Sequence, residues 1–362
     1  MNTKNHNPLP SFTRWCPASR FAIALFVVCG LCGPLACASQ ERPLTFEDVF
    51  REESRIDLDS SDDYLLGPLP KIGAVASNGD CIVLDFVTTR VDVFDGKGRG
   101  KKHLGAPGDG PGEYRYPLAL AAAHDGDFYL YDMMLSRVSI YGSDYAFRNS
   151  FSPSARLEGI HVTVEGRVFG YVNTSGELHV VHELNSQGGT LKEFAPQSEN
   201  YNVAAASRGG GIVSVGRFLY VATPYEYTLW KYSLDGDLVK TAQGQSPFYA
   251  PLREPPDAMV LDDMRKRDEY MRSWSQFYQL LKIDDHWLGA VYADPQGSRV
   301  FMDLYDTDLN QIAGSLQLPE FMGGPGALFT REGLLYLLVE PADESSNPTV
   351  VTYALRKPPD TL

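Results

Sequence analysis

Short apolar stretches alternate with Gly- or Asp-containing turns along most of the chain, and they come in pairs typical of β-hairpins. The pairs recur about every 40 to 50 residues, which is the spacing of β-propeller blades. A third apolar strand and a more polar fourth strand usually follow each pair. The pattern predicts an all-β fold, a six-bladed β-propeller of four-stranded antiparallel blades. The turns of the pairs are Asn78-Gly79, Asp125-Gly126, Glu165-Gly166, Val215-Gly216, Asp284-Asp285 and Glu332-Gly333.

The last of the repeat units supplies only three strands, because the chain stops soon after the apolar run 350–354. A strand-like alternation near residues 55–59 has no partner of its own. We expect this N-terminal strand to complete the last blade, since such pairing closes the ring and removes an exposed sheet edge.

One insertion interrupts the repeat between blades 4 and 5. Met264, Met271 and Trp274 recur there at helical spacing, after a pair of prolines. This spacing predicts an amphipathic helix over residues 257–276, with its apolar side packed on the propeller and its charged side in water.

The N-terminus reads as an export signal over residues 1–38, which leaves 39–362 as a single β-propeller domain. Its apolar run, 21–31, is too short to span a membrane. The sequence around Cys37 fits either ordinary signal peptidase or a bacterial lipobox, from which Pro34 departs. We favour lipid attachment at Cys37, hence a periplasmic or outer-membrane-anchored lipoprotein whose only membrane contact is the anchor. Soluble secretion is the alternative.

Net charge and cysteine content restrict the classes of partner and the covalent links that are possible. The formal net charge of −14 excludes nucleic acid as a plausible partner, because the phosphate backbone attracts basic surfaces. Four of the five cysteines lie in the leader, so Cys81 is alone in the mature part and no intramolecular disulfide is possible there. Cys81 opens an apolar run and is predicted to be a buried, inert thiol.

Two stretches carry a family resemblance. Residues 85–95 and the glycine-rich loop 105–117 resemble the strand, turn and inter-blade loop of NHL-type six-bladed propellers, specifically exported bacterial six-bladed β-propeller proteins. A second copy of the strand pattern follows in 132–141. The fourth unit departs from it, with Thr223 and Thr228 where the pattern has Asp and Arg.

Strand direction alternates within a blade, so the hairpins between second and third strands lie on the same face as the blade-to-blade connections. We call it the working face and expect function there. Paired residues Asp85/Arg90 and Asp132/Arg137 stand at identical spacing, which favours a structural hairpin clasp over ligand capture. The candidate ligand-binding residues are Glu113, Tyr114, Arg90, Arg137 and Tyr225.

No motif for a metal or a cofactor is present in the mature sequence, and none is predicted. His179 and His182 are three apart in a predicted strand, so we expect their side chains on opposite faces and unable to share an ion.

Two functional classes remain. We favour a binding or scaffold module for a small molecule, a glycan or a protein on the loop-rich working face. Some propellers that this chain resembles at fold level are metal-dependent lactonases or lyases, with ligands converging in the central channel. The resemblance therefore implies an alternative, an enzyme of that kind holding Ca or Zn.

Overall fold

The computed structural model describes residues 42–174, 176–198, 209–253, 263–322, 327–341, 343 and 345–356. The chain divides into two units, Met1–Arg42 and Pro43–Leu362, and the second contains the propeller. The predicted signal 1–38 and the lipid attachment site Cys37 lie outside the described residues. None of the described helices is long and apolar enough to cross a membrane.

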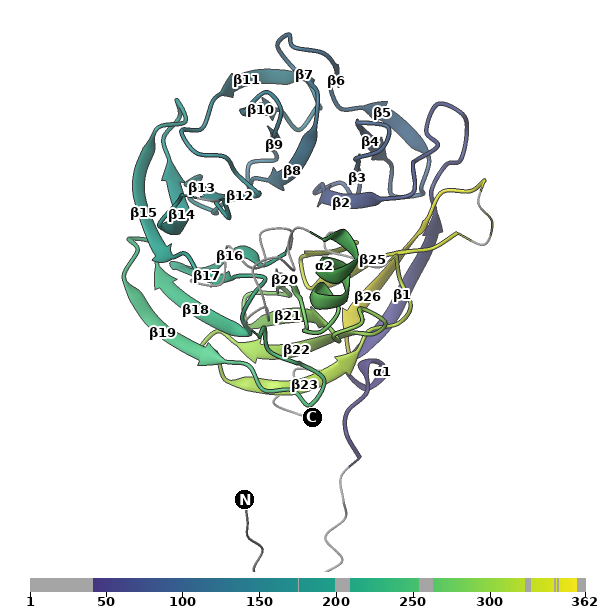
Figure 1. Cartoon of the computed structure of the whole chain (residues 1–362). Coiled ribbons are helices and arrows are strands. Elements are labelled where there is room, and N and C mark those ends of the chain that lie inside the picture. The colour runs from purple at the N-terminus through teal and green to yellow at the C-terminus, as the bar shows by residue number, and fades with distance from the viewer. Residues whose placement is uncertain are drawn as a thin grey trace, which may run out of the picture. The chain divides into compact units, whose positions relative to one another are not determined.

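The described strands form six four-stranded antiparallel sheets arranged around a central axis (Figure 1), which confirms the predicted fold. A short parallel pair, β6 (Ala106–Pro107) and β7 (Glu113–Tyr114), lies in the connection between blades 1 and 2. Blade 1 contains β2 (Pro70–Val75), β3 (Cys81–Asp85), β4 (Arg90–Phe94) and β5 (Gly100–His103). Blade 2 contains β8 (Pro117–Ala122), β9 (Phe128–Asp132), β10 (Arg137–Tyr141) and β11 (Phe147–Phe151).

Blades 3 to 5 follow the same order. Blade 3 contains β12 (Gly159–Val162), β13 (Val168–Tyr171), β14 (His179–Leu184) and β15 (Thr190–Pro196). Blade 4 contains β16 (Gly211–Val215), β17 (Phe218–Ala222), β18 (Thr228–Ser233) and β19 (Leu238–Gln243). Blade 5 contains β20 (Phe277–Lys282), β21 (Trp287–Ala293), β22 (Val300–Asp306) and β23 (Gln311–Gln317).

The sixth blade combines both ends of the propeller. Its strands are β24 (Leu328–Arg331), β25 (Leu334–Val339), β26 (Thr349–Leu355) and β1 (Phe50–Asp57), with β1 antiparallel to β26. The closing strand thus starts earlier than the alternation near 55–59 suggests. Helix α1 (Phe46–Val49) precedes it and buries Phe46 beside Tyr353, so hydrophobic contacts as well as the strand ladder stabilise the closure.

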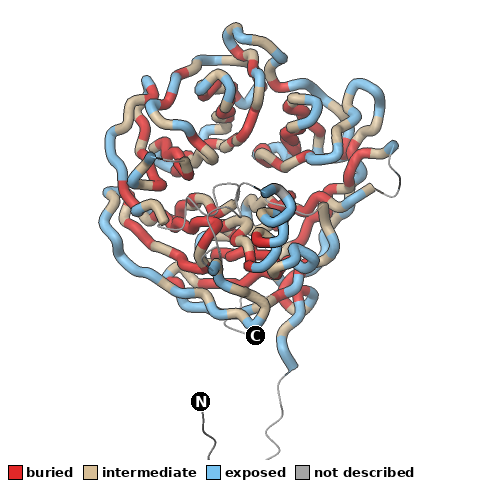
Figure 2. The backbone as a smooth tube through the Cα atoms, viewed as in Figure 1, coloured by how far each residue is buried: buried red, intermediate tan, exposed pale blue. Residues whose placement is uncertain are grey.

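The core lies between the blades rather than in one central mass. Among the described residues, the buried apolar side chains form a cluster at each boundary between neighbouring blades. Buried residues concentrate in the second and third strands of the blades, and exposed ones lie along the outer strands (Figure 2). Cys81 belongs to one of these clusters, and burial raises the pKa of its thiol to about 12, which keeps it protonated and unreactive.

The inserted helix is shorter than predicted. Helix α2 (Met264–Met271) lies between β19 and β20, whereas 257–276 was expected, and residues 254–262 are outside the described part. Asp263 caps α2 by accepting bonds from the N–H groups of its first turn. Tyr270 and the following Trp274 pack against Tyr225 on the working face of blade 4.

Candidate functional site

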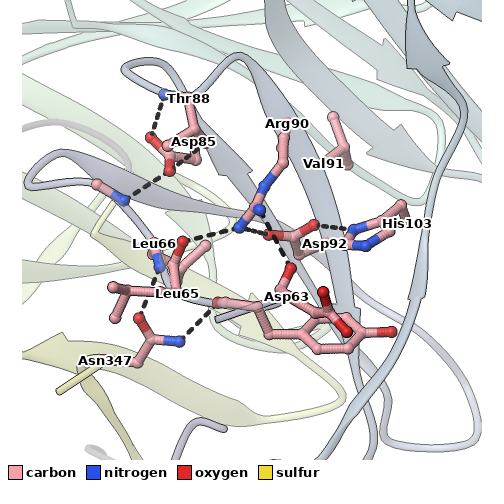
Figure 3. Close-up of polar contacts among 12 residues, drawn as sticks. Asp63, Leu65, Leu66, Asp85, Thr88, Arg90, Val91, Asp92, His103 and Asn347 are labelled. Atoms are coloured by element: carbon pink, nitrogen blue, oxygen red, sulfur yellow. Dashed lines mark hydrogen bonds and ion pairs between the residues drawn. The ribbon is translucent and has the colours of Figure 1, made fainter. Parts of the chain in front are cut away.

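On the working face of blade 1, Asp85 binds the backbone of the segment leading into β2. Its carboxylate accepts bonds from Gly67 N at 2.6 Å and, within its own hairpin, from Val87 N at 2.9 Å and the Thr88 hydroxyl at 2.5 Å (Figure 3). Asp85 is fully buried. The carboxylate therefore has no room for an external ligand.

Arg90 holds the same leading segment from the other side of the hairpin. Its guanidinium donates to the carbonyls of Asp63 at 3.1 Å and Leu65 at 2.8 Å, and it pairs with the Asp92 carboxylate at 3.0 Å (Figure 3). Asp85 and Arg90 are paired in the β3–β4 ladder, but no hydrogen bond or ion pair among the described residues joins the guanidinium to the Asp85 carboxylate. The two residues of this hairpin clasp thus act in parallel on one stretch of backbone.

Two further side chains complete this corner of blade 1. Asn347, from blade 6, accepts a bond from Leu66 N at 2.7 Å and donates to Tyr64 O at 2.8 Å. The His103 ring lies 2.6 Å from Asp92 Oδ1 and stacks on Tyr64. Burial raises the pKa of Asp92, although His103 and the nearby guanidinium oppose that shift.

The second blade repeats the clasp. Asp132 accepts a bond from Tyr116 N at 2.7 Å, and Arg137 donates to the carbonyls of Gly110 at 3.0 Å and Glu113 at 2.6 Å. The partners are again the backbone of the connection that leads into the blade. Arg90 and Arg137, two of the candidate ligand-binding residues, are therefore occupied by the protein's own chain.

Glu113 and Tyr114 do not lie where the sequence interpretation placed them. Glu113 Oε2 accepts a bond from Gly110 N at 2.7 Å, so its side chain folds back into its own loop. Tyr114 is 2% exposed, and its hydroxyl accepts a bond from Val91 N at 3.1 Å. Its ring is part of the core between blades 1 and 2, because β7 directs it inward. Burial accordingly raises its pKa to about 12.

One carboxylate lies near both histidines of blade 3. Glu193, on the neighbouring strand β15, lies 3.6 Å from His179 and 3.9 Å from His182. That the two rings do not share an ion stays a prediction. Even so, no three His, Cys, Asp or Glu side chains among the described residues are placed to hold a metal ion.

A cavity of about 820 Å³ runs along the inner strands at the centre of the propeller. Each inner strand is hydrogen-bonded on one side only, so unpaired backbone N–H and C=O groups face this channel. The inner strands are β2, β8, β12, β16, β20 and β24. Such a wall suits water and polar molecules better than apolar ones.

Polar side chains gather on the side of the channel formed by blades 3 to 5. His161 Nε2 lies 2.7 Å from Ser214 Oγ, and removal from water together with the charge of Lys282 lowers the pKa of His161 to about 4. Its ring is therefore neutral at neutral pH. Among the described residues, the buried Tyr171 hydroxyl and Gln279 amide oxygen have no hydrogen-bond partner.

A glycine run keeps this part of the channel open. Residues 209–211 have φ values of +149°, +74° and +131°, a region that side-chain-bearing residues rarely adopt. A Cβ on Gly210 would lie 2.6 Å from the Tyr171 hydroxyl, and one on Gly209 would lie 2.2 Å from the Phe277 carbonyl oxygen. Only glycine leaves the tyrosine hydroxyl room here.

A second hollow, of about 580 Å³, opens on the working face at blade 4. Tyr225, Tyr227 and Tyr249 line it, and we call it the aromatic hollow. The Tyr225 hydroxyl is bound to Asn173 at 2.7 to 3.0 Å, but its ring remains part of the wall. Of the five candidate ligand-binding residues, Tyr225 lines the aromatic hollow, and the other four line neither it nor the central channel.

The sequence matches a known protein family. The family described as 6-bladed beta-propeller, DUF5128, matches residues 37–314. The chain belongs to this family. A comparison with curated protein sequences finds no match.

Solved structures resemble this six-bladed propeller at low sequence identity. A protein of Bacteroides fragilis described as exported is 13% identical, with a TM-score of 0.62, and the alignment covers 87% of this chain and 97% of that one. A DUF4221 family member from Bacteroides vulgatus is 10% identical, with a TM-score of 0.65 and coverage of 86% and 99%. At these identities the likeness extends to the fold alone.

The polar groups of the channel could not be found from the sequence. Tyr171, His161, Ser214 and Gln279 come from three blades, and dozens of residues separate the contributions of one blade from those of the next. The glycine run 209–211 was the one local signal, because three successive glycines next to a strand indicate a close approach of backbone.

Proposed function

We propose that this chain is an exported ligand-binding module that takes a small hydroxyl-bearing molecule, such as a glycan fragment, in the central channel. The observation that carries the proposal is the pair of unpartnered polar atoms in the channel wall, the Tyr171 hydroxyl and the Gln279 amide oxygen. Burying such groups without a partner costs about 1–3 kcal/mol each, a cost that a bound ligand relieves.

The chemistry of the wall favours a neutral polar ligand. The tyrosine hydroxyl and the glutamine oxygen offer a donor and an acceptor on either side of the glycine run 209–211. Neutral His161 and Ser214 add a further polar pair deeper in the channel. A molecule bearing several hydroxyls can donate and accept at each of these positions.

Export and anchoring complete the proposal. The leader 1–38 supports export, and lipidation at Cys37 would hold the propeller at a membrane surface, either periplasmic or on the outer membrane. Mass spectrometry of the mature protein tests this part. An N-terminal Cys37 carrying acyl mass is expected, and an unmodified N-terminus at Ser39 would replace the anchored form by a secreted one. None of the described contacts supports the metal-dependent enzyme, so we propose no reaction.

Channel binding is tested with a panel of mono- and disaccharides, measured by thermal shift and calorimetry on the mature protein. A ligand at a hundred times its Kd raises stability by about 2.7 kcal/mol. Tyr171→Phe and Gln279→Leu are expected to weaken binding by about tenfold while leaving the fold intact. Tyr129→Phe, which removes a hydroxyl from β9 outside the channel lining, is the matched control. Equal affinity in all variants would contradict the channel site.

A further inference from the structure

The aromatic hollow is built from two segments that meet on the working face. One is the hairpin between β17 and β18, and the other is the connection that leaves β19. Its wall combines tyrosine rings, prolines and amides. The lining residues are Tyr225, Glu226, Tyr227, Gln243, Gly244, Gln245, Ser246, Pro247, Tyr249, Pro251 and Leu252. A volume of about 580 Å³ is within the range of small-molecule sites.

The ionisable side chains that line the aromatic hollow give it a negative charge. Among the described residues that line it, Glu226 is the single ionisable acid, and no Lys, Arg or His is present. Glu226 accepts a bond from the Ser198 hydroxyl at 2.5 Å, which fixes the carboxylate at the wall. An anionic ligand would meet no cation here, whereas a cation would meet a carboxylate.

The rings themselves favour a cation. Tyr227 and Tyr249 pack on each other, with centroids 5.0 Å apart and planes inclined by 49°; Tyr227 is 3% exposed and Tyr249 is half-buried, so the Tyr249 ring is the more accessible of the two. The face of an aromatic ring carries negative electrostatic potential and attracts ammonium groups. The Tyr249 hydroxyl is buried and has no hydrogen-bond partner in the part of the chain that the structure describes. It is an additional polar group that a ligand can engage.

A buried carboxylate behind the wall strengthens this field. The Tyr227 hydroxyl donates to Asp303, which is fully buried and also accepts bonds from Tyr292 at 3.1 Å and Gln311 at 2.9 Å. Donation to a carboxylate shifts electron density into the phenol ring, because linked hydrogen bonds polarise one another. The ring of Tyr227 is therefore more electron-rich than that of an unbonded tyrosine.

We propose that the aromatic hollow binds an organic ammonium cation, with the ammonium group against the accessible part of the Tyr249 ring, which packs on Tyr227, and within reach of the Glu226 carboxylate. The site is separate from the channel and takes a ligand of different chemistry, so it goes beyond the function proposed above. Because the hollow is larger than a lone ammonium group requires, the natural ligand carries further atoms that contact the prolines and amides.

Calorimetry on the mature protein tests the site with choline and tetramethylammonium as probes. The control is the neutral isostere of choline in which carbon replaces the nitrogen, because it keeps the shape and removes the charge. We expect choline to bind at least about tenfold more tightly than the isostere, a difference of about 1.4 kcal/mol. Added salt should weaken choline binding and leave the isostere unaffected.

Matched variants separate the ring from the hydroxyl and from the charge. Tyr249→Phe should retain choline affinity within about threefold, whereas Tyr249→Leu should lower it about tenfold. Glu226→Gln should weaken choline by about fivefold with no change for the isostere. Tyr249 is half-buried, so these variants are expected to fold, and thermal melts verify this for each one.

Three results would overturn the cation site: equal binding of choline and its isostere, equal losses for Tyr249→Phe and Tyr249→Leu, or no binding of either cation. Tyr171→Phe, in the channel, should leave choline affinity unchanged. A failure of the channel proposal and a failure of the cation proposal are thereby distinguished, because each has its own ligand and its own variants.

Discussion

The working face is built differently on its two sides. In blades 1 and 2, an Asp and an Arg at the ends of the second and third strands bind the backbone of the connection leading into the blade. In blade 4, the equivalent positions are Thr223 and Thr228, and a hollow of about 580 Å³ lies beside their hairpin. Blades 1 and 2, which carry the Asp and Arg pairs, bind their connections closely, whereas blade 4, which lacks the pair, has a hollow at the corresponding hairpin.

Side-chain length explains the difference. A guanidinium reaches carbonyl groups across the hairpin, as Arg90 does to Asp63 and Leu65, but a threonine hydroxyl is too short. The Thr223 hydroxyl is buried and has no partner among the described residues, and Thr228 starts β18 with its side chain buried. The connection after β19, which leaves blade 4, packs against aromatic side chains and α2, and the aromatic hollow lies beside it.

The strongest test of the comparison removes the carboxylate of a clasp. Asp85→Ala and Asp132→Ala should each destabilise the protein by about 3 kcal/mol, because several buried N–H donors lose their acceptor. Chemical denaturation measures the loss. Asp144→Ala, an exposed acid in a hairpin turn, is the control and should cost less than about 1 kcal/mol. Equal losses would mean that the clasps contribute little.

A second test distinguishes the two arginines. Arg137→Ala should cost about 1–2 kcal/mol, because three carbonyl bonds are lost at a partly exposed site. Arg90→Ala should cost about 1 kcal/mol more, since it also leaves the fully buried Asp92 with one cation fewer, where blade 2 has Ser139. Denaturant midpoints of Arg90→Ala in an Asp92→Ser background check the assignment. There the difference from Arg137→Ala should disappear.

The fold was largely predictable, and the site was not. Alternating apolar strands and turn residues such as Gly79, with φ of +83°, are local signals, and they repeat in every blade. The hollows depend on which residues from different blades meet. Tyr227 and Asp303 are 76 positions apart, and no spacing along the chain links them. Charged pairs such as Asp132 and Arg137 can be recognised in the sequence. Their partners in the fold are backbone atoms, and these cannot be identified from residue types.

Acid titration tests whether His161, in the wall of the central channel, is neutral in the folded protein. The pKa of His161 is about 4 in the fold against an ordinary 6.5, so the folded state favours the neutral ring. This contribution to stability is complete above about pH 6.5 and is lost as the pH falls toward 4. His161→Gln keeps a partner for Ser214 and should lose about 3 kcal/mol less than wild type over that interval. Parallel pH curves for the two proteins would contradict a buried neutral histidine.

The smallest effect is expected for Glu113, which the sequence singled out as a ligand contact. Its carboxylate accepts one N–H bond, from Gly110, and a Cβ on Gly108 would lie 2.1 Å from it, so the loop folds around this side chain. Glu113→Gln keeps an acceptor and should cost less than about 0.5 kcal/mol, and Glu113→Ala about 1 kcal/mol. Neither should change choline or saccharide affinity, because Glu113 lines neither hollow. Calorimetry on both variants decides. A loss of affinity at unchanged stability would place a ligand on the clasped side of the face, and the contrast between closed and open blades would then be wrong.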